Sequence, residues 1–179
     1  SLLPTSWVAR AARGTLRVAL SGDGGDEMFM GYERYGAVRW LRAARWAAMV
    51  TPPGCLARRD PRSRSAKLAR LLVAARHHGY ADLCAAFPTP DWIALLAGGS
   101  GSNVETYNIE PDDPLDARDA DLETHFPGDM LRKVDHASLS VGLELRAPFL
   151  ASPVANAVLH LSEDQLMPHS ERKGLLRAV

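Results

Sequence analysis

Cysteine is scarce in this sequence: Cys55 and Cys84 are the only two, and no C-x-x-C pair is present. That scarcity excludes a disulfide-built scaffold and a zinc-ribbon site, and it is typical of the reducing cytoplasm. The sequence also has no apolar run near the roughly 20 residues that cross a membrane, and no signal-peptide pattern. We therefore expect a cytoplasmic protein with no membrane partner.

Net charge is absent as well, since 21 basic and 21 acidic residues balance. No overall field then attracts nucleic acid or a membrane surface. The charges are nevertheless uneven, with a strongly basic stretch from Arg34 to Arg76 and a strongly acidic one from Glu105 to Glu123. We expect these stretches to face each other or solvent. A nucleic-acid patch is the alternative, but the aromatic platform of single-strand binders is missing.

An initiator methionine is missing too, and the chain opens at Ser1 in mid-pattern, so we expect a piece of a longer protein. Its 179 residues, 46% of them hydrophobic, suffice for one core and indicate one unit rather than two. A glycine- and serine-rich stretch at 98–103 is typical of a surface loop.

Only one stretch is typical of a strand: Leu16–Leu20, which ends abruptly at a glycine-rich turn. Helical patterns dominate elsewhere, so the predicted fold class is mainly α with one short strand. Thr5 or Ser6 is the expected cap of the first helix, which ends near Arg13. Further helices are predicted around 37–48, 68–75, 81–87, 92–97, 115–125, 130–141, 153–161 and 171–178, and the segment 146–150 is expected to break the helix that starts near 130.

The segment that follows the predicted strand carries the chemistry, and it reads Ser21-Gly22-Asp23-Gly24-Gly25-Asp26-Glu27. Its glycines permit a sharp turn and let a ligand approach the backbone N–H groups closely. The start of a following helix offers unpaired donors, which suit phosphate. Three acids in the same segment suit a magnesium ion that accompanies phosphates. The segment therefore predicts a magnesium–nucleotide site.

Other interpretations of this segment were weighed. The dinucleotide fingerprint G-x-G-x-x-G fails, because Glu27 stands where its third glycine belongs. An EF-hand fails on the spacing of its ligands. A plain strand-to-helix turn with a capping aspartate stays open as an interpretation from the residues alone.

Three blocks of sequence, in the same order, resemble the asparagine synthetase family. The first is Val18-Ala19-Leu20-Ser21-Gly22-Asp23-Gly24-Gly25-Asp26-Glu27 with Phe29, Gly31, Tyr32, Arg34 and Tyr35. The second holds Pro127, Asp129, Leu131, Lys133-Val134-Asp135, Ala137-Ser138, Leu143-Glu144, Arg146 and Pro148-Phe149-Leu150. The third and weaker block is Lys173-Gly174-Leu175-Leu176-Arg177.

This resemblance implies a synthetase domain with an α/β fold of the adenine-nucleotide α-hydrolase (ATP pyrophosphatase) type. Residues 1–179 would form its C-terminal part, without the first ATP loop and without the N-terminal glutaminase domain. The implied enzyme is a ligase that amidates aspartate to asparagine through an acyl-adenylate and releases AMP and pyrophosphate. ATP, Mg²⁺, aspartate and ammonia from the upstream glutaminase are its implied partners, and a homo-oligomer is compatible with them.

The resemblance also implies roles for individual residues. The ATP contacts would come from Ser21, Gly22, Gly24 and Gly25. Asp23 would lie near the forming adenylate, and Asp26 would serve magnesium–pyrophosphate. Tyr32 would assist catalysis, with core packing as the alternative. Lys173 would hold the transition-state charge and the pyrophosphate, with a solvated helix charge as the alternative. An ion pair between Glu144 and Arg146 is expected to be structural, and His77, His78 and His136 to be solvated or core histidines.

The sequence departs from the family pattern at Met30, where glycine is usual, at His136, where arginine is common, and at Ala151, where aspartate is usual. It also holds no S-G-G-x-D-S loop and no glutaminase cysteine at its start. Two alternative functions follow. One is an amidotransferase acting on another carboxylate, and the other is a non-catalytic helical binding or scaffold module of the same descent.

Overall fold

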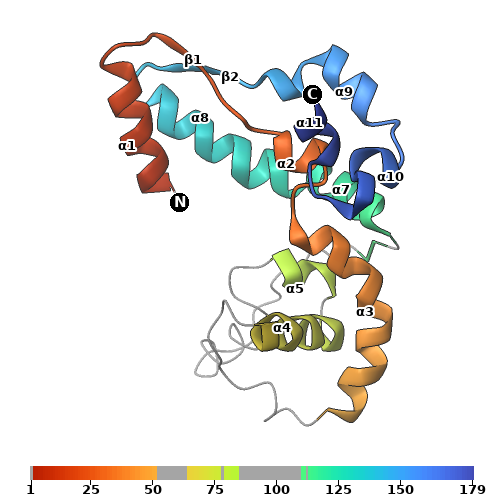
Figure 1. Ribbon diagram of the computed structural model, residues 1–179. Coiled ribbons are helices and arrows are strands. Elements are labelled where there is room, and N and C mark those ends of the chain that lie inside the picture. The colour runs from red at the N-terminus through yellow and green to blue at the C-terminus, as the bar shows by residue number, and fades with distance from the viewer. Residues whose placement is uncertain (1, 52–63, 78, 85–109, 112) are drawn as a thin grey trace, which may run out of the picture. The chain divides into compact units, whose positions relative to one another are not determined.

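The computed structural model of the chain describes residues 2–51, 64–77, 79–84, 110–111 and 113–179. The predicted helix at 92–97 and the loop at 98–103 lie outside the described residues, as do Cys55 and His78. The described part is mainly helical, which confirms that prediction, and Figure 1 shows its elements. The chain divides into two compact units rather than one: residues 1–32 with 118–179, and residues 33–117.

The helices and strands of the first unit begin with α1 and end with α11. In chain order they are α1 (Leu2–Arg13), β1 (Val18–Leu20), α2 (Gly25–Met28), η2 (Phe126–Leu131), α8 (Arg132–Leu139), β2 (Glu144–Arg146), η3 (Pro148–Leu150), α9 (Ser152–Val158), α10 (Glu163–Leu166), η4 (Pro168–Ser170) and α11 (Gly174–Ala178). The second unit holds α3 (Glu33–Val50), α4 (Arg64–Arg76) and α5 (Tyr80–Cys84). Helix α7 (Pro114–Glu123) spans the boundary.

Strand β1 does not stand alone, as the sequence had suggested, but pairs in parallel with β2. The register places Val18 opposite Glu144 and Leu20 opposite Arg146. A hydrogen bond from the Ser21 backbone N–H to the Arg146 carbonyl, 2.8 Å long, extends the pairing into the glycine-rich loop. The helix predicted from Met130 to Val141 was expected to break at residues 146–150. It ends earlier, at Leu139, and residues 144–146 satisfy their backbone groups in the ladder.

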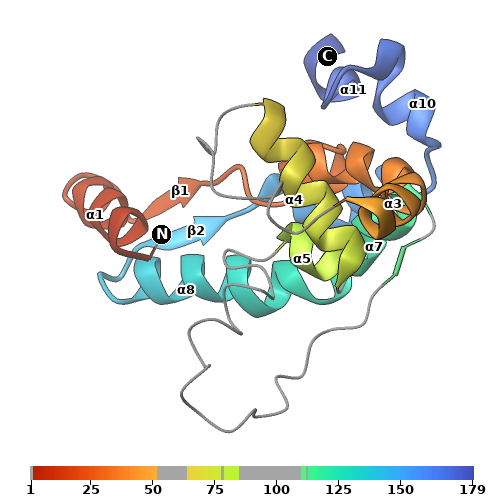
Figure 2. The same cartoon turned by 90° about the horizontal axis from the view of Figure 1, so that it is seen from below.

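Helix α8 packs against both β2 and α1, and it runs beside the strand pair in Figures 1 and 2. Helix α1 begins at Leu2, before Thr5 and Ser6, so the prediction of a cap at those residues was wrong. The Ser6 hydroxyl instead donates to the Leu2 carbonyl one turn back. The predicted end at Arg13 is confirmed. These contacts hold the strand pair, and the loop after β1, against a helical layer.

Helices α7 and α8 are linked by a π-helical segment, η2, in the place where the sequence suggested two separate helices. Pro127 lies in its first turn and has no backbone N–H to donate. A π turn accommodates such a residue between the two helices. Phe126 is buried at the start of this segment.

In the second unit, α3 packs against α4 and α5. The buried face of α3 repeats at helical spacing and consists of Tyr35, Val38, Leu41, Ala44 and Ala48. Arg45 of the basic stretch forms a 2.6 Å ion pair with Glu110 of the acidic stretch, as expected for stretches that face each other. Both side chains are exposed, so the pair adds less than about 1 kcal/mol.

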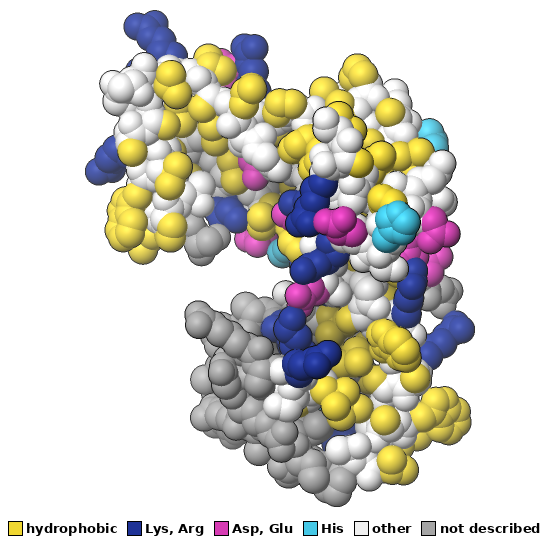
Figure 3. Space-filling view, viewed as in Figure 1, with side chains coloured by type: hydrophobic (Ala, Val, Ile, Leu, Met, Phe, Trp, Pro, Cys, Tyr) yellow, Lys and Arg dark blue, Asp and Glu magenta, His cyan; other side chains and the backbone are white. Residues whose placement is uncertain are grey.

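Exposed apolar side chains lie on α1 and on α3, and Figure 3 shows hydrophobic side chains in yellow on the surface over each helix. On α1 they are Leu2, Leu3, Trp7 and Val8, and on α3 they are Trp40, Trp46, Met49 and Val50. Within the described ranges, no helix has both the length and the apolar character needed to cross a membrane.

Candidate functional site

The glycine-rich loop lies at the carboxyl end of β1, which is where parallel sheets place their ligands. Gly22 is exposed, and a side chain built on it would meet nothing within 4 Å. Its backbone is therefore open to a close approach by a ligand. Asp23 follows and is half-buried.

Gly24 and Gly25 are buried, and they contact the segment 148–150 of the second sequence block. Gly24 has φ +86°, and a Cβ there would lie 2.4 Å from Leu150 Cδ2. A Cβ on Gly25 would lie 3.3 Å from the Phe149 ring, which also meets Phe29 edge-on at 5.6 Å. Gly24 is thus required by its backbone conformation and by the packing of η3 on the loop, whereas a side chain at Gly25 would need the Phe149 ring to shift by a few tenths of an ångström.

An ion pair joins Asp26 and Lys173, two residues that lie 147 positions apart in the sequence. Asp26 Oδ1 and Lys173 Nζ are 2.8 Å apart. Their side chains are 41% and 30% exposed respectively, so a ligand can reach both. Gly31 lies against this pair, since a Cβ on it would fall 1.9 Å from Asp26 Oδ1 and 2.5 Å from Lys173 Cε. The first and third sequence blocks therefore meet at one place.

Tyr32 is half-buried and its phenol donates a 2.8 Å hydrogen bond to Glu27 Oε1. Glu27 is 2% exposed and lies on α2, next to Asp26. The sequence had not given Glu27 a role of its own. Its place inside the motif was the signal that could have pointed to such a role. A buried acid needs a hydrogen-bond partner, and Tyr32 is that partner here.

The non-glycine residues with left-handed backbone lie within a few positions of Asp26 or Lys173 in the sequence. Met30 has φ 55° and is fully buried, and Lys173 has φ 55° as well. His169 and Ser170, just before Lys173, have φ 57° and φ 61°. Such conformations cost about 1–3 kcal/mol each and persist where the surroundings enforce them. The glycine that is usual at position 30 would adopt this conformation without that cost.

The position of Lys173 is fixed by the packing of its neighbours. Gly174 is buried, and a Cβ on it would lie 2.8 Å from Pro168 Cδ, so η4 sits directly on the start of α11. Glu171 and Arg177 form a 2.6 Å ion pair across the same turn. Lys173 is thus held beside Asp26, with its side chain partly exposed.

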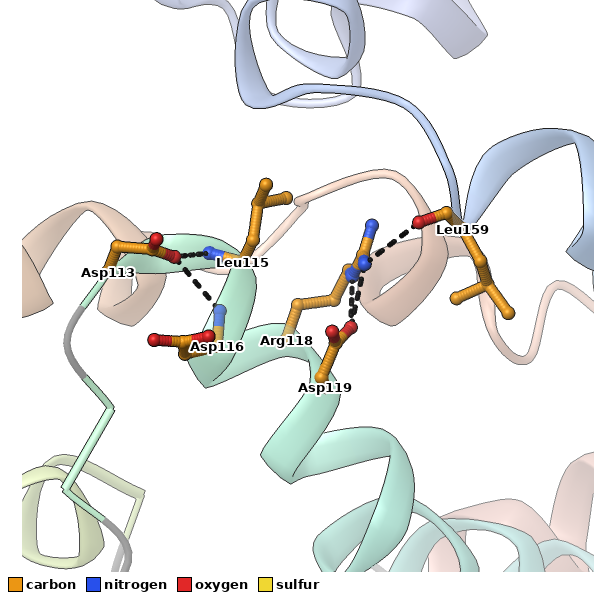
Figure 4. Close-up of polar contacts among 6 residues, drawn as sticks. All are labelled: Asp113, Leu115, Asp116, Arg118, Asp119 and Leu159. Atoms are coloured by element: carbon orange, nitrogen blue, oxygen red, sulfur yellow. Dashed lines mark hydrogen bonds and ion pairs between the residues drawn. The ribbon is translucent and has the colours of Figure 1, made fainter.

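Figure 4 shows how α7 is anchored. The Asp113 carboxylate accepts hydrogen bonds from the backbone N–H groups of Leu115 and Asp116, at 2.7 and 3.0 Å, which caps the helix. Further along, Arg118 is buried, pairs with Asp119 at 2.7 Å and donates to the Leu159 carbonyl at 3.3 Å. The sequence did not single out Arg118, because an arginine in a charged helix is ordinarily solvated.

Other expectations concern the Glu144–Arg146 pair, two histidines and metal ligands. Arg146 Nε and Glu144 Oε1 are 2.8 Å apart and both side chains are exposed, which confirms a surface ion pair. His77 and His136 are exposed, as expected of solvated histidines. Among the described residues, no group of three or more histidines, cysteines, aspartates or glutamates is arranged to hold a metal ion.

The loop is nevertheless compatible with a magnesium ion that arrives with phosphates. Magnesium of this kind commonly takes only one or two carboxylates from the protein and its other ligands from water and phosphate. Asp26 offers such a carboxylate at an accessible position. The donor chemistry therefore fits, with Asp26 as the residue that would hold the ion.

A comparison with protein families matches residues 1–179 to the family described as asparagine synthase. The chain belongs to that family, which confirms the resemblance seen in its three sequence blocks. It is similar to the putative asparagine synthetase (glutamine-hydrolyzing) of Mycobacterium tuberculosis, with 28% identity over 191 residues, 99% of this chain and 29% of that protein.

A second relative is asparagine synthetase (glutamine-hydrolyzing) 1 of Bacillus subtilis, with 26% identity over 198 residues, 98% of this chain and 29% of that protein. The chain thus spans less than a third of the length of these curated relatives. No solved structure matches the chain.

Proposed function

We propose that the chain contributes part of the synthetase site of an enzyme that makes asparagine from aspartate, ATP and glutamine-derived ammonia. The observation that carries this proposal is the Asp26–Lys173 ion pair at the mouth of an exposed glycine loop. An acid, a fixed cation and an accessible backbone are what a magnesium–phosphate group needs. Family membership and the names of the relatives support the same assignment.

The proposed reaction has two steps. The side-chain carboxylate of aspartate attacks the α-phosphorus of ATP, the bond to the β-phosphate oxygen breaks, and pyrophosphate leaves. Ammonia then attacks the acyl carbon, the bond to the AMP oxygen breaks, and a proton is lost to give asparagine. Adenylation is needed because a carboxylate oxygen is a poor leaving group and AMP is a good one.

The residues of the chain take distinct parts in this proposal. Ser21 and Gly22 present the exposed loop to the nucleotide, and Asp23 lies next to them for the adenylate. Lys173 neutralises charge that builds on the leaving pyrophosphate, in a position fixed before substrate binds. Asp26 orients Lys173 and would hold the magnesium, which as a Lewis acid lowers the cost of that charge.

An exchange assay on the whole protein tests the function. With aspartate present, radiolabelled pyrophosphate should be incorporated into ATP, and omission of aspartate should abolish the incorporation. A panel of other carboxylates belongs in the same assay, because Ala151 and His136 depart from the family pattern. Exchange with another acid but not aspartate would favour a different amidation. Absence of exchange with every acid would favour a non-catalytic module.

A further inference from the structure

A cavity of about 110 Å³ lies beside α3 in the second unit. Its lining comes from α3, from the turn that begins α5 and from residues 110–111. A space of this size holds several water molecules or a small ligand. None of the described residues that line it belongs to the glycine loop or to α11, so the cavity is not part of the site proposed above.

The lining of this cavity is strongly basic. Arg39, Arg42 and Arg45 follow one another at intervals of three on α3, so their side chains are neighbours on the helix surface. Glu110 is the acid among the described lining residues, and its Oε1 lies 2.6 Å from Arg45 Nη2. Three guanidinium groups and one carboxylate leave an excess of two positive charges at the cavity. Like charges at this spacing repel, and an anion bound between them would relieve the repulsion.

A second part of the lining is neutral and held in place. Gly79 and Tyr80 are buried. The Tyr80 hydroxyl accepts a 3.1 Å hydrogen bond from Arg34 Nε and donates one of 3.4 Å to the Ala117 carbonyl. A Cβ on Gly79 would lie 3.7 Å from Arg45 Nη2, so that guanidinium lies against the turn. A concave site with buried walls strengthens the field of the charges that line it.

We propose that this cavity binds the phosphate group of a small molecule. A phosphate group carries close to two negative charges at neutral pH, which matches the excess, whereas a single carboxylate would neutralise only half of it. Each guanidinium presents five N–H donors in a planar fork, so an arginine that already has a partner keeps donors for phosphate oxygens. The inference does not depend on the proposed function.

Equilibrium dialysis of the whole protein against radiolabelled inorganic phosphate tests the site. Arg42→Gln should weaken phosphate binding about tenfold or more, because it removes a charge and its hydrogen bonds. Glu110→Gln should tighten binding about threefold or more, because it removes the negative charge that competes with the ligand. Arg10→Gln, the same change at an exposed residue of α1, is the matched control and should bind phosphate like the wild type.

The Glu110 variant separates a ligand site from a structural role, since loss of an ion pair that only holds the fold would not improve binding. Displacement of labelled phosphate by glycerol phosphate would identify a phosphate monoester as the ligand, and its failure to displace would identify free phosphate. If Arg42→Gln does not fold, Arg39→Gln takes its place. No binding by the wild type, or no gain in Glu110→Gln, would overturn the inference. Binding that is lost in Lys173→Gln but kept in Arg42→Gln would place the anion at the glycine loop and would overturn it too, as would preferential displacement of the phosphate by a short RNA.

Discussion

At the scale of single residues, Gly31 is the position where a side chain has least room. A Cβ there would lie 1.9 Å from the Asp26 carboxylate and 2.5 Å from Lys173 Cε. We expect Gly31→Ala to push the ion pair apart and to reduce the synthetase rate on the order of a hundredfold, since it misplaces a preorganised cation. Steady-state assays of asparagine formation measure this loss.

Gly36 provides the matched control for that change. It lies on α3, and a Cβ built on it meets nothing within 4 Å. Gly36→Ala should keep the rate and stabilise the helix by about 0.5–1 kcal/mol, because alanine is the better helix former. If Gly31→Ala were as active as Gly36→Ala, the ion pair would have no part in the reaction.

Asp26 carries the second prediction at this scale. Replacement by asparagine keeps its size and its ability to accept a hydrogen bond from Lys173, but removes the charge. We expect pyrophosphate exchange to fall on the order of a hundredfold, comparable to the loss of one preorganised electrostatic partner. Glutamine hydrolysis should survive, and folding should change by about 0.5 kcal/mol or less.

The control for Asp26→Asn is the same change at Asp164, an exposed residue of α10. Exchange and glutaminase rates are measured side by side. A fall in exchange alone reports the lost charge, whereas a fall in both rates reports a protein that is misfolded. Asp26 lies inside α2, whose N-cap is Gly24 without a side-chain cap, so the interpretation of Asp26 as a capping aspartate was wrong. If the charge of Asp26 had no part in the reaction, exchange would be unchanged. That result would remove Asp26 from the proposed magnesium site.

At the scale of elements, the start of α7 depends on Asp113. Its carboxylate receives two backbone N–H groups that have no partner inside the helix. Asp113→Ala should lower the free energy of unfolding by about 1 kcal/mol, whereas Asp113→Asn should cost much less, because both acids and amides cap well. Urea denaturation of the three proteins measures the difference, and equal midpoints for all three would show that the cap is dispensable.

The elements also show how far the sequence could predict the structure. Local patterns predicted three features correctly: the end of α1, the glycine loop after β1 and the apolar face of α3. Strand β2 was missed because Glu144-Leu145-Arg146 offers one apolar residue between two charges and no alternation to detect. The helix start at Leu2 was missed because Thr5 and Ser6 are good caps, although Pro4 is tolerated in a first turn.

The candidate site was predictable in its residues but not in its contacts. The loop can be identified from its pattern of glycines and acids, because glycines permit sharp turns and acids bind magnesium. That Gly31 touches Lys173, or that Gly24 touches Leu150, depends on packing between distant segments and leaves no local signal.

At the scale of the whole molecule, the sequence contains no S-G-G-x-D-S loop. In the proposed function, a loop of that kind supplies donors to pyrophosphate which neither Ser21 nor Lys173 replaces. A polypeptide limited to residues 1–179 should therefore show no aspartate-dependent exchange above background. Exchange by the whole protein in the same assay is the positive control, and robust exchange by the 179 residues alone would contradict the prediction.

The parallel pairing of β1 with β2 has a consequence for synthesis on the ribosome. Val18 must wait for Glu144, more than a hundred residues later, before β1 can pair with β2. At about 5–20 residues per second, the edge of β1 that β2 covers stays without that partner for on the order of ten seconds. Lys173 reaches Asp26 later still, so the growing chain displays a β edge and an incomplete loop throughout that interval. Translation speed and chaperone capture during this window should therefore govern how much of the protein escapes aggregation.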